Sequence, residues 1–492
     1  MKEGEKPLRL LLINPGFNYH TPYLQVTEPL GVLYLAAFGR RYSQHEFVVL
    51  DCLDSKQVTK TAAGGYWYGL DHHEMVSWAR EVQPDLIGLT CMFSRKKDDL
   101  LTAAKALRDG LPNVPLVAGG THASLFPSED LATRLFDYCV IGEGERTLVA
   151  LADALEGRGR LAEIDGLGFR ENGRVHINPK QHFIKDLDSI PFPARDLINY
   201  DGYLSRKSVI HCLGLKRAAS VLTSRSCPNR CNFCSMHRIH GPRWRARTPQ
   251  DVVAELIHLK NAYDVQEFFV MDDNFTLNKK RVLEFCQLLK EAKLSLRWNT
   301  PNGIAINTLD YEVLQAMQDA GCVSICIAIE SGDEDLRNRV IGKRLSNQKI
   351  EEVTRMAADL GLFTTAFYII GMPGETEDRF QRTLDQLRQL PLNGVAAAFA
   401  NPLPGTKLYD DCLANHWTIL QDDDPKQNAF YKPYIVTVDF DEPALLRREK
   451  QFYRTFVRAK LLRIFKDTLL FRNKLLYPPF LLRILKDRLC RQ

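Results

Sequence analysis

Residues 220–234 read SVLTSRSCPNRCNFC, a short apolar run that passes directly into a loop with three closely spaced cysteines. The apolar run is typical of a buried strand, and Cys227, Cys231 and Cys234 follow it with three and two residues between them. Thiolates are soft ligands that suit iron–sulfur clusters. A 4Fe-4S cube has four irons, so three cysteines leave one iron without a protein ligand. The stretch therefore predicts a cluster whose open iron can chelate a second molecule and pass it an electron.

Zinc is the alternative that the same spacing allows. A structural zinc site takes four ligands, and His237 or His240 would be the fourth here. The other cysteines are scattered along the chain, several of them in or beside apolar runs such as Val323–Ile329, where a buried thiol behaves as a small hydrophobe. Only residues 223–234, called the cysteine loop below, group their cysteines in a ligand-like pattern.

Downstream of this loop, apolar runs alternate with amphipathic helical patterns, as in parallel β/α units. Six strands, counting the one before the cysteines, predict a partial TIM-type (β/α)6 barrel with its reactive groups at the carboxyl ends of the strands. An open doubly wound sheet is the alternative, and periodicity does not separate the two. The later strands are predicted at Glu267–Met271, Leu296–Asn299, Val323–Ile329, Phe363–Ile370 and Val395–Asn401, with helices at Thr248–Ala262, Lys279–Ala292, Asp310–Ala320, Asn347–Leu360 and Asp378–Leu390.

Upstream, a first alternating series predicts a Rossmann-like parallel sheet flanked by helices, an α/β fold. Its strands are predicted at Leu8–Ile13, Phe47–Leu50, Leu86–Thr90, Pro115–Ala118 and Tyr138–Ile141, and its helices at Gly31–Tyr42, Glu74–Val82 and Asp98–Asp109. A hairpin of Gly166–Arg170 and Arg174–Asn178 is assigned to a linker. The predicted domains are therefore 1–160, the linker 161–205, the barrel 206–410 and a helical C-terminal region 411–492.

Paired glycines follow two strands of the first sheet, in Gly119-Gly120-Thr121-His122 and Gly142-Glu143-Gly144-Glu145. Glycines at strand ends suit a flat, bulky ligand that lies against the backbone. The residues alone fit a nucleotide, a flavin or cobalamin equally well. The Gly-x-Gly-x-x-Gly dinucleotide pattern is absent.

The cysteine loop and the motifs that follow it resemble the radical S-adenosylmethionine superfamily. The resemblance covers about residues 8–410. Over this range the sequence is similar to the branch of the superfamily that adds a cobalamin-binding domain. That branch contains a bacteriochlorophyll oxidative cyclase and cobalamin-dependent radical methyltransferases. It implies three cofactors: a 4Fe-4S cluster, S-adenosylmethionine and cobalamin, with residues 1–160 as the cobalamin domain. The downstream motifs are Met271-Asp272-Asp273-Asn274-Phe275, Ile329-Glu330-Ser331-Gly332, Gly371-Met372-Pro373-Gly374-Glu375 and Asn401-Pro402-Leu403-Pro404-Gly405-Thr406.

The resemblance also implies which residues bind cofactors, and no catalytic residue is assigned. Asp272 and Asp273 are acceptors at a strand end, with a helix cap for the segment from Asn278 as the structural alternative. Glu330 is expected to touch S-adenosylmethionine, with a salt bridge to Arg337 or Arg339 as its alternative. Gly371 and Gly374 are expected to let the backbone approach a bound cofactor closely, with a plain turn as the alternative. The expected cobalamin contacts are Gly119, Gly120, His122, Gly142 and Gly144.

The sequence departs from many cobalamin domains at one point. The Asp-x-His-x-x-Gly motif that places a histidine under cobalt is not found, and Asp71-His72-His73-Glu74 lacks its glycine. This weakens the assignment of a cobalt ligand more than that of cobalamin. His122 has a satisfied loop histidine as its alternative, and Tyr66, Trp67 and Tyr68 fit either a wall for the corrin or ordinary packing.

Charge and hydropathy limit the partners. The formal charge is +5, and residues 458–492 alone sum to +8, ten Lys/Arg against two Asp, so the rest of the chain sums to −3. No basic stripe outside this tail indicates nucleic acid. No signal peptide or spanning segment is found, which predicts a cytoplasmic protein. The basic, apolar tail fits either packing of its apolar face on the barrel, with a solvated basic face, or peripheral membrane contact, and the second makes a lipid-like small-molecule substrate more plausible. A flavodoxin or ferredoxin is expected as the one-electron reductase.

The favoured function is methyl transfer through cobalamin to an unactivated carbon or phosphorus centre. A radical cyclase or rearrangement enzyme without methyl transfer shares every motif above. A cobalamin- or redox-sensing binding protein is the alternative that is not an enzyme.

Overall fold

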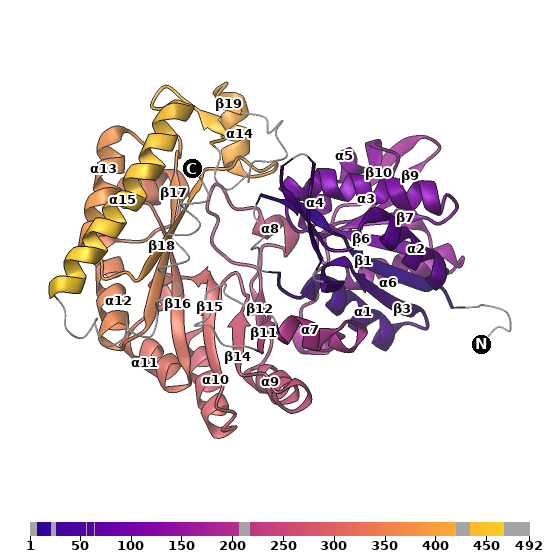
Figure 1. Cartoon of the computed structure of the whole chain (residues 1–492), viewed down its shortest axis with the longest axis horizontal. Coiled ribbons are helices and arrows are strands. Elements are labelled where there is room, and N and C mark those ends of the chain that lie inside the picture. The colour runs from indigo at the N-terminus through magenta and orange to yellow at the C-terminus, as the bar shows by residue number, and fades with distance from the viewer. Residues whose placement is uncertain are drawn as a thin grey trace.

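The computed structural model describes residues 7–20, 26–55, 57–62, 64–205, 217–419 and 433–466. Two sheets with their flanking helices lie side by side, and the short helix α8 after the cysteine loop lies between them (Figure 1). Within these residues, every helix is too short or too polar to cross a lipid bilayer. Most of the predicted basic tail, and with it the predicted membrane contact, lies outside the described residues.

The first sheet has seven strands in the order β10-β9-β8-β7-β6-β1-β3. Its parallel strands are apolar on both faces because helices cover both sides, so Leu10 and Leu12 pack in one core while Leu11 and Ile13 pack in another. The strands are β1 (Arg9–Asn14), β3 (Glu46–Asp51), β6 (Leu86–Thr90), β7 (Leu116–Gly119), β8 (Tyr138–Val140), β9 (Leu167–Glu171) and β10 (Arg174–Ile177), and the helices are α1 (Leu30–Tyr42), α2 (His72–Val82), α3 (Lys97–Gly110), α4 (Gly120–Leu125), α5 (Pro127–Ala132) and α6 (Glu145–Leu155).

The hairpin assigned to the linker is present, but it belongs to the first sheet. β9 pairs antiparallel with β8, and β10 continues the sheet beyond it. The linker assignment was wrong for these strands because their partner lies far upstream in the sequence. A small antiparallel sheet of β2 (Phe17–Tyr19), β5 (Tyr66–Tyr68) and β4 (Val58–Lys60) was not predicted at all.

The second sheet contains the six predicted strands, all parallel, in the order β11-β14-β15-β16-β17-β18. Within the described residues β11 and β18 do not pair with each other, so the sheet does not close into a barrel. Its strands are β11 (Ala218–Val221), β14 (Glu267–Val270), β15 (Arg297–Ile304), β16 (Cys322–Glu330), β17 (Phe363–Ile370) and β18 (Gly394–Phe399), and its helices are α9 (Pro249–Tyr263), α10 (Lys279–Glu291), α11 (Tyr311–Asp319), α12 (Asn347–Asp359) and α13 (Glu377–Gln389).

Short elements connect and flank the two sheets. They are α7 (Tyr200–Ser205), β12 (Ser224–Arg225), α8 (Met236–Ile239), β13 (Arg245–Ala246), the π-helix η7 (Leu336–Ile341), α14 (Lys407–Ala414), β19 (Thr418–Ile419) and β20 (Ile435–Val436). β12 lies inside the cysteine loop and pairs with β13, so the first half of that loop is held as a short antiparallel ladder.

Within the predicted helical C-terminal region lies α15 (Glu442–Lys466), which runs along α13 and the β17–β18 side of the sheet (Figure 1). Its side chains bond the free edge of β18. The Tyr453 hydroxyl accepts a hydrogen bond from Ala397 N at 3.1 Å, and Lys460 donates to the carbonyl of Asn393. An open sheet leaves unpaired backbone groups at its edges, and α15 satisfies part of this edge.

Candidate functional site

The three cysteines lie together, half-buried, on the loop that leaves β11. Cys234 N donates to the carbonyl of Cys231 at 3.0 Å, which closes a tight turn between these two cysteines. Burial raises the pKa of Cys231 to about 12 and that of Cys234 to about 11. Without a metal both side chains are therefore thiols, and metal binding must release their protons.

A single zinc ion would need closely spaced ligand atoms. Zinc–sulfur bonds of about 2.3 Å bring tetrahedral ligands to roughly 3.8 Å from one another. Among the described residues, only His45, Asp153 and Glu156 place three such ligand atoms within 4.8 Å of one another. Arg158 already pairs with both of those acids.

His240 was one of the two candidates for a fourth zinc ligand, and its surroundings are charged. His240 lies against the first domain, with Nδ1 4.0 Å from a carboxylate oxygen of Glu143. Burial and the nearby charges of Arg225 and Arg245 lower the pKa of His240 to about 4.

Three consecutive residues after β14 hold the cysteine loop. Asp272, 2% exposed, accepts from Thr223 N at 2.6 Å and from the hydroxyls of Thr223 and Ser224. Asp273 accepts from the backbone N–H of Ser226, and burial raises the pKa of Asp273 to about 6. Asn274 donates its amide to the Cys227 sulfur at 3.6 Å.

These contacts change the interpretation of Asp272. Its carboxylate accepts hydrogen bonds from Thr223 and Ser224 of the cysteine loop, so Asp272 holds the start of that loop in place. The helix-cap alternative was wrong, because α10 begins at Lys279 and its cap is the side chain of Asn278, which accepts from Arg281 N.

Glu330 ends β16 in the left-handed region, with φ of 68°. Its carboxylate pairs with Lys343 Nζ at 2.5 Å. Lys343 lowers the pKa of the Cys231 thiol, and Glu330 raises it. The alternative pairing with Arg337 or Arg339 was wrong. Arg337 donates to the carbonyls of Ser331 and Leu345, and Arg339 pairs with Asp335. Glu330 therefore stands close to the cysteines, at the carboxyl edge of the second sheet.

The turn after β17 has two glycines in the left-handed region, with φ of 81° at Gly371 and 82° at Gly374. Gly371 N donates to Glu375 Oε2 at 2.8 Å. The C-terminal helix supports this turn, because Arg448 donates to the backbone carbonyl and the carboxylate of Glu375. A Cβ at Gly371 would lie 3.0 Å from Leu445. Sequence reasoning missed this contribution of α15.

The glycines of the first sheet differ in what surrounds them. A Cβ at Gly120 would lie 2.7 Å from the carbonyl oxygen of Cys91, and one at Gly142 would lie 3.0 Å from that of Ile239 in α8. At Gly144 a Cβ would meet Val140 at 3.0 Å. Packing within the protein therefore already requires these three glycines. Gly119 has no such close neighbour, since its nearest contact is at 3.8 Å.

His122 lies in helix α4 and is 1% exposed. Its Nε2 is 3.3 Å from Asp130 Oδ1, and its ring stacks on Phe126. These contacts favour a histidine packed within the protein, but it lies in a helix and not in the predicted loop. Packing also accounts for Trp67, which lies against Gly16 and donates to the carbonyl of Leu70.

The glutamates between the glycines form the link that the sequence did not reveal. Arg225 of the cysteine loop donates to Glu145 Oε1 at 2.6 Å and lies 3.3 Å from Glu143. Glu143 also accepts from Arg245 at 2.7 Å and from Ile184 N at 3.0 Å. Burial alone would raise the pKa of Glu143, but the charges of Arg225 and Arg245 lower it. The carboxyl edge of the first sheet is thus clamped onto the cysteine loop.

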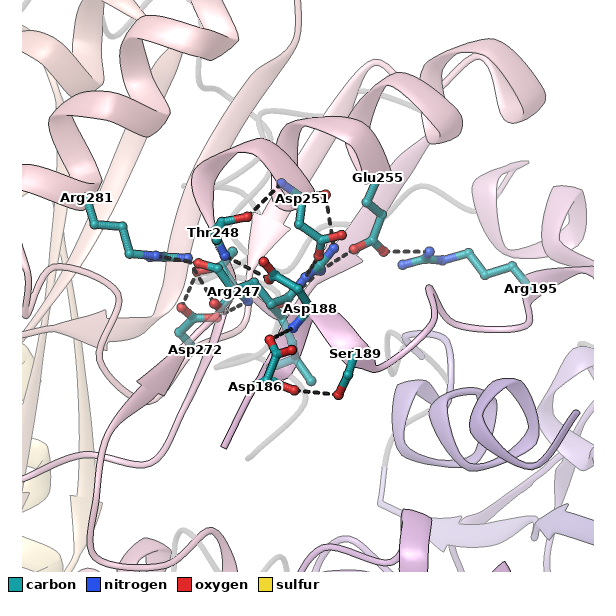
Figure 2. Close-up of polar contacts among 12 residues, drawn as sticks. Asp186, Asp188, Ser189, Arg195, Arg247, Thr248, Asp251, Glu255, Asp272 and Arg281 are labelled. Atoms are coloured by element: carbon teal, nitrogen blue, oxygen red, sulfur yellow. Dashed lines mark hydrogen bonds and ion pairs between the residues drawn. The ribbon is translucent and has the colours of Figure 1, made fainter. Parts of the chain in front are cut away.

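A second group of buried charges supports the strand that leads into the loop (Figure 2). The carbonyl of Ser220 at the free edge of β11 accepts from Arg195 at 2.8 Å. The carbonyl of Leu222, just after the strand, accepts from Arg247 at 3.0 Å. Both arginines pair with Glu255, which is fully buried in α9. Arg281 donates to the carbonyl of Thr223 at 2.9 Å.

The first domain caps the same strand edge. Glu28 accepts from Ser220 N at 2.7 Å and from the Ser220 hydroxyl at 3.2 Å. The strand that carries the cysteine loop is therefore held on one side by β14 and on the other by charged side chains from other parts of the chain.

Comparison with known proteins agrees with this architecture. Residues 221–387 match the Radical SAM superfamily, in which SAM is S-adenosylmethionine, and residues 21–152 match the B12 binding domain. An uncharacterized methyltransferase of Pyrococcus horikoshii is 32% identical over 84% of each chain. The cytidylyl-2-hydroxyethylphosphonate methyltransferase of Streptomyces wedmorensis is 28% identical over 92% of this chain and 91% of its own. The structure of the radical S-adenosylmethionine methyltransferase TsrM from Kitasatospora setae, with cobalamin and a 4Fe-4S cluster bound, aligns with a TM-score of 0.66 at 19% identity, over 82% of this chain and 77% of that one.

Proposed function

This chain belongs to the radical S-adenosylmethionine superfamily, in the branch that also carries a B12-binding domain, and we propose that it transfers a methyl group to an unactivated carbon or phosphorus centre of a small molecule. The observation that carries the proposal is the clamp of Glu143 and Glu145 on Arg225. It fixes the cysteine loop against the carboxyl edge of the B12-binding domain. Transfer between two cofactors needs such a fixed separation.

Each part of the site has a proposed role. Cys227, Cys231 and Cys234 would hold the cluster, which would supply the electron that starts radical chemistry on S-adenosylmethionine. Glu330 accepts hydrogen bonds from the nucleoside, and the left-handed turn at Gly371 and Gly374 lets the backbone approach it closely. The open end of the second sheet, in the form of a partial barrel, would surround the substrate.

On the side of the first sheet, Gly119 is the glycine that leaves room for a flat ligand. The other four predicted cobalamin contacts are Gly120, His122, Gly142 and Gly144. They have close neighbours within the protein and would support the carboxyl edge of the first sheet without touching the ligand. Stacking the corrin on this edge and the nucleoside on the other would exclude water from the space between the domains.

Partners follow from this chemistry. We propose a flavodoxin or ferredoxin as the electron donor, and a cytoplasmic location in which such donors are found. A lipid-like substrate and membrane contact through the basic tail stay part of the proposal.

The test is anaerobic reconstitution with iron, sulfide and hydroxocobalamin, followed by addition of dithionite and methyl-labelled S-adenosylmethionine. Methyl transfer predicts that label moves from S-adenosylmethionine to the corrinoid, and then to a product in cell extract detected by mass spectrometry. Label found only in methionine, together with release of 5′-deoxyadenosine, would support cyclisation or rearrangement instead. If no 5′-deoxyadenosine and no label transfer were detected, the chain would be a binding protein.

A further inference from the structure

Asn274 is the third residue of the run that holds the cysteine loop, and its side chain reaches a cluster ligand directly. It is 1% exposed, and its amide nitrogen Nδ2 lies 3.6 Å from Cys227 Sγ, within hydrogen-bond distance for sulfur. Among the described residues its amide oxygen has no hydrogen-bond partner. An oxygen turned toward a thiolate would repel it, so the amide nitrogen is the atom that faces the sulfur.

The backbone of Asn274 is fixed on both sides. Its carbonyl accepts from the indole of Trp244 at 2.9 Å and from the Ser224 hydroxyl at 3.4 Å. The next residue, Phe275, is 1% exposed and packs edge-on against Trp298. The amide therefore has a defined position beside the sulfur before any metal binds.

We propose that Asn274 is a positioning residue that donates an N–H···S hydrogen bond to the Cys227 thiolate and so raises the reduction potential of the cluster. The proposal rests on the proposed function, because it assumes the cluster on these cysteines. Reduction adds one electron, supplied by the reductase or by dithionite, and the added negative charge spreads over the sulfurs. A donor aimed at a sulfur stabilises the reduced form more than the oxidised form.

The experiment compares Asn274→Leu, which keeps the side-chain volume and removes the donor, with the wild type. Asn307→Leu is the matched control, because Asn307 is exposed and donates its amide to the carbonyl of Arg344, away from the cysteines. Each protein is reconstituted anaerobically, checked for iron and sulfide content, and titrated with dithionite while the reduced cluster is followed by electron paramagnetic resonance. We expect a roughly tenfold smaller equilibrium constant for reduction in Asn274→Leu, about 59 mV in midpoint potential, and no shift in the control.

A second measurement uses the wild type alone, so that a variant that fails to load iron does not leave the question open. Pulsed electron paramagnetic resonance of protein labelled with 15N in asparagine side chains is expected to show one nitrogen coupled to the reduced cluster. Absence of that coupling, or a loaded Asn274→Leu protein with an unchanged potential, would overturn the role of Asn274. A wild type that binds no cluster would instead overturn the proposed function itself.

Discussion

The buried charges behind β11 provide the sharpest test of how the cysteine loop is held. Glu255 is fully buried and pairs with Arg195 and Arg247, which are 2% and 5% exposed. Glu255→Gln keeps the shape and removes the charge. Each pair of unit charges about 4 Å apart is worth about 4 kcal/mol at an effective dielectric constant near 20, and desolvation offsets most of this gain in the intact network.

The loss of unfolding free energy in Glu255→Gln therefore depends on which buried arginine is left without a carboxylate. Arg247 keeps a second carboxylate, Asp251 at 2.6 Å, but Arg195 loses its ion-pair partner. Removing one partner of a buried pair costs about 3–5 kcal/mol, and we expect a loss in that range. Because Arg195 and Arg247 bond the carbonyls of the strand before the cysteines, iron loading should fall as well.

The assay is urea unfolding of the metal-free, reduced protein, followed by circular dichroism, with iron content measured after reconstitution. Glu351→Gln is the control, since Glu351 forms an exposed pair with Arg355 on α12 and should change the free energy of unfolding by less than about 0.5 kcal/mol. If Glu255→Gln lost no more stability than Glu351→Gln, the supporting role of the network would be refuted.

Three further predictions concern other parts of the fold. Burial raises the pKa of Glu267 to about 7, so the wild type loses stability as pH rises from about 4.5 to 7. Above pH 7, Glu267→Gln should be more stable than the wild type by up to about 3 kcal/mol. If the urea midpoints of variant and wild type differed by the same amount at pH 5 and at pH 8, this prediction would be contradicted. Tyr453→Phe leaves the buried N–H of Ala397 without its partner and should cost about 1–3 kcal/mol in the same assay, whereas Tyr311→Phe, at an exposed tyrosine, should change little. Arg225→Lys gives up the fork that spans two glutamates and should weaken hydroxocobalamin binding about tenfold in equilibrium dialysis, so an unchanged affinity would argue against the clamp.

Local patterns in the sequence were sufficient for the elements of the fold. The six strands of the second sheet and the five parallel strands of the first were predicted because short apolar runs alternate with amphipathic stretches. The cysteine loop was found because its ligands lie within eight residues of one another. The place of the β9–β10 hairpin was missed because strand pairing over a long separation leaves no local signal, and the exposed strand β4 (Val58–Lys60) has no apolar alternation.

Contacts between distant residues account for the errors at the site. Arg225 and Glu145 are 80 positions apart, and a charge in one motif does not indicate which charge in another will meet it. For the same reason Glu330 was paired with the nearby Arg337 or Arg339, although the turn after η7 returns Lys343 to it. Asp272 was correctly placed at a strand end, but its partners in the loop depend on the register between β11 and β14.

The central claim is that Cys227, Cys231 and Cys234 hold a 4Fe-4S cluster with one iron open to S-adenosylmethionine. The most direct measurement is electron paramagnetic resonance of the dithionite-reduced, reconstituted protein before and after S-adenosylmethionine is added. The account predicts about four irons per chain and a spectrum that changes on addition, both of which Cys231→Ala should abolish. A colourless zinc protein, or a cluster whose spectrum S-adenosylmethionine leaves unchanged, would contradict it.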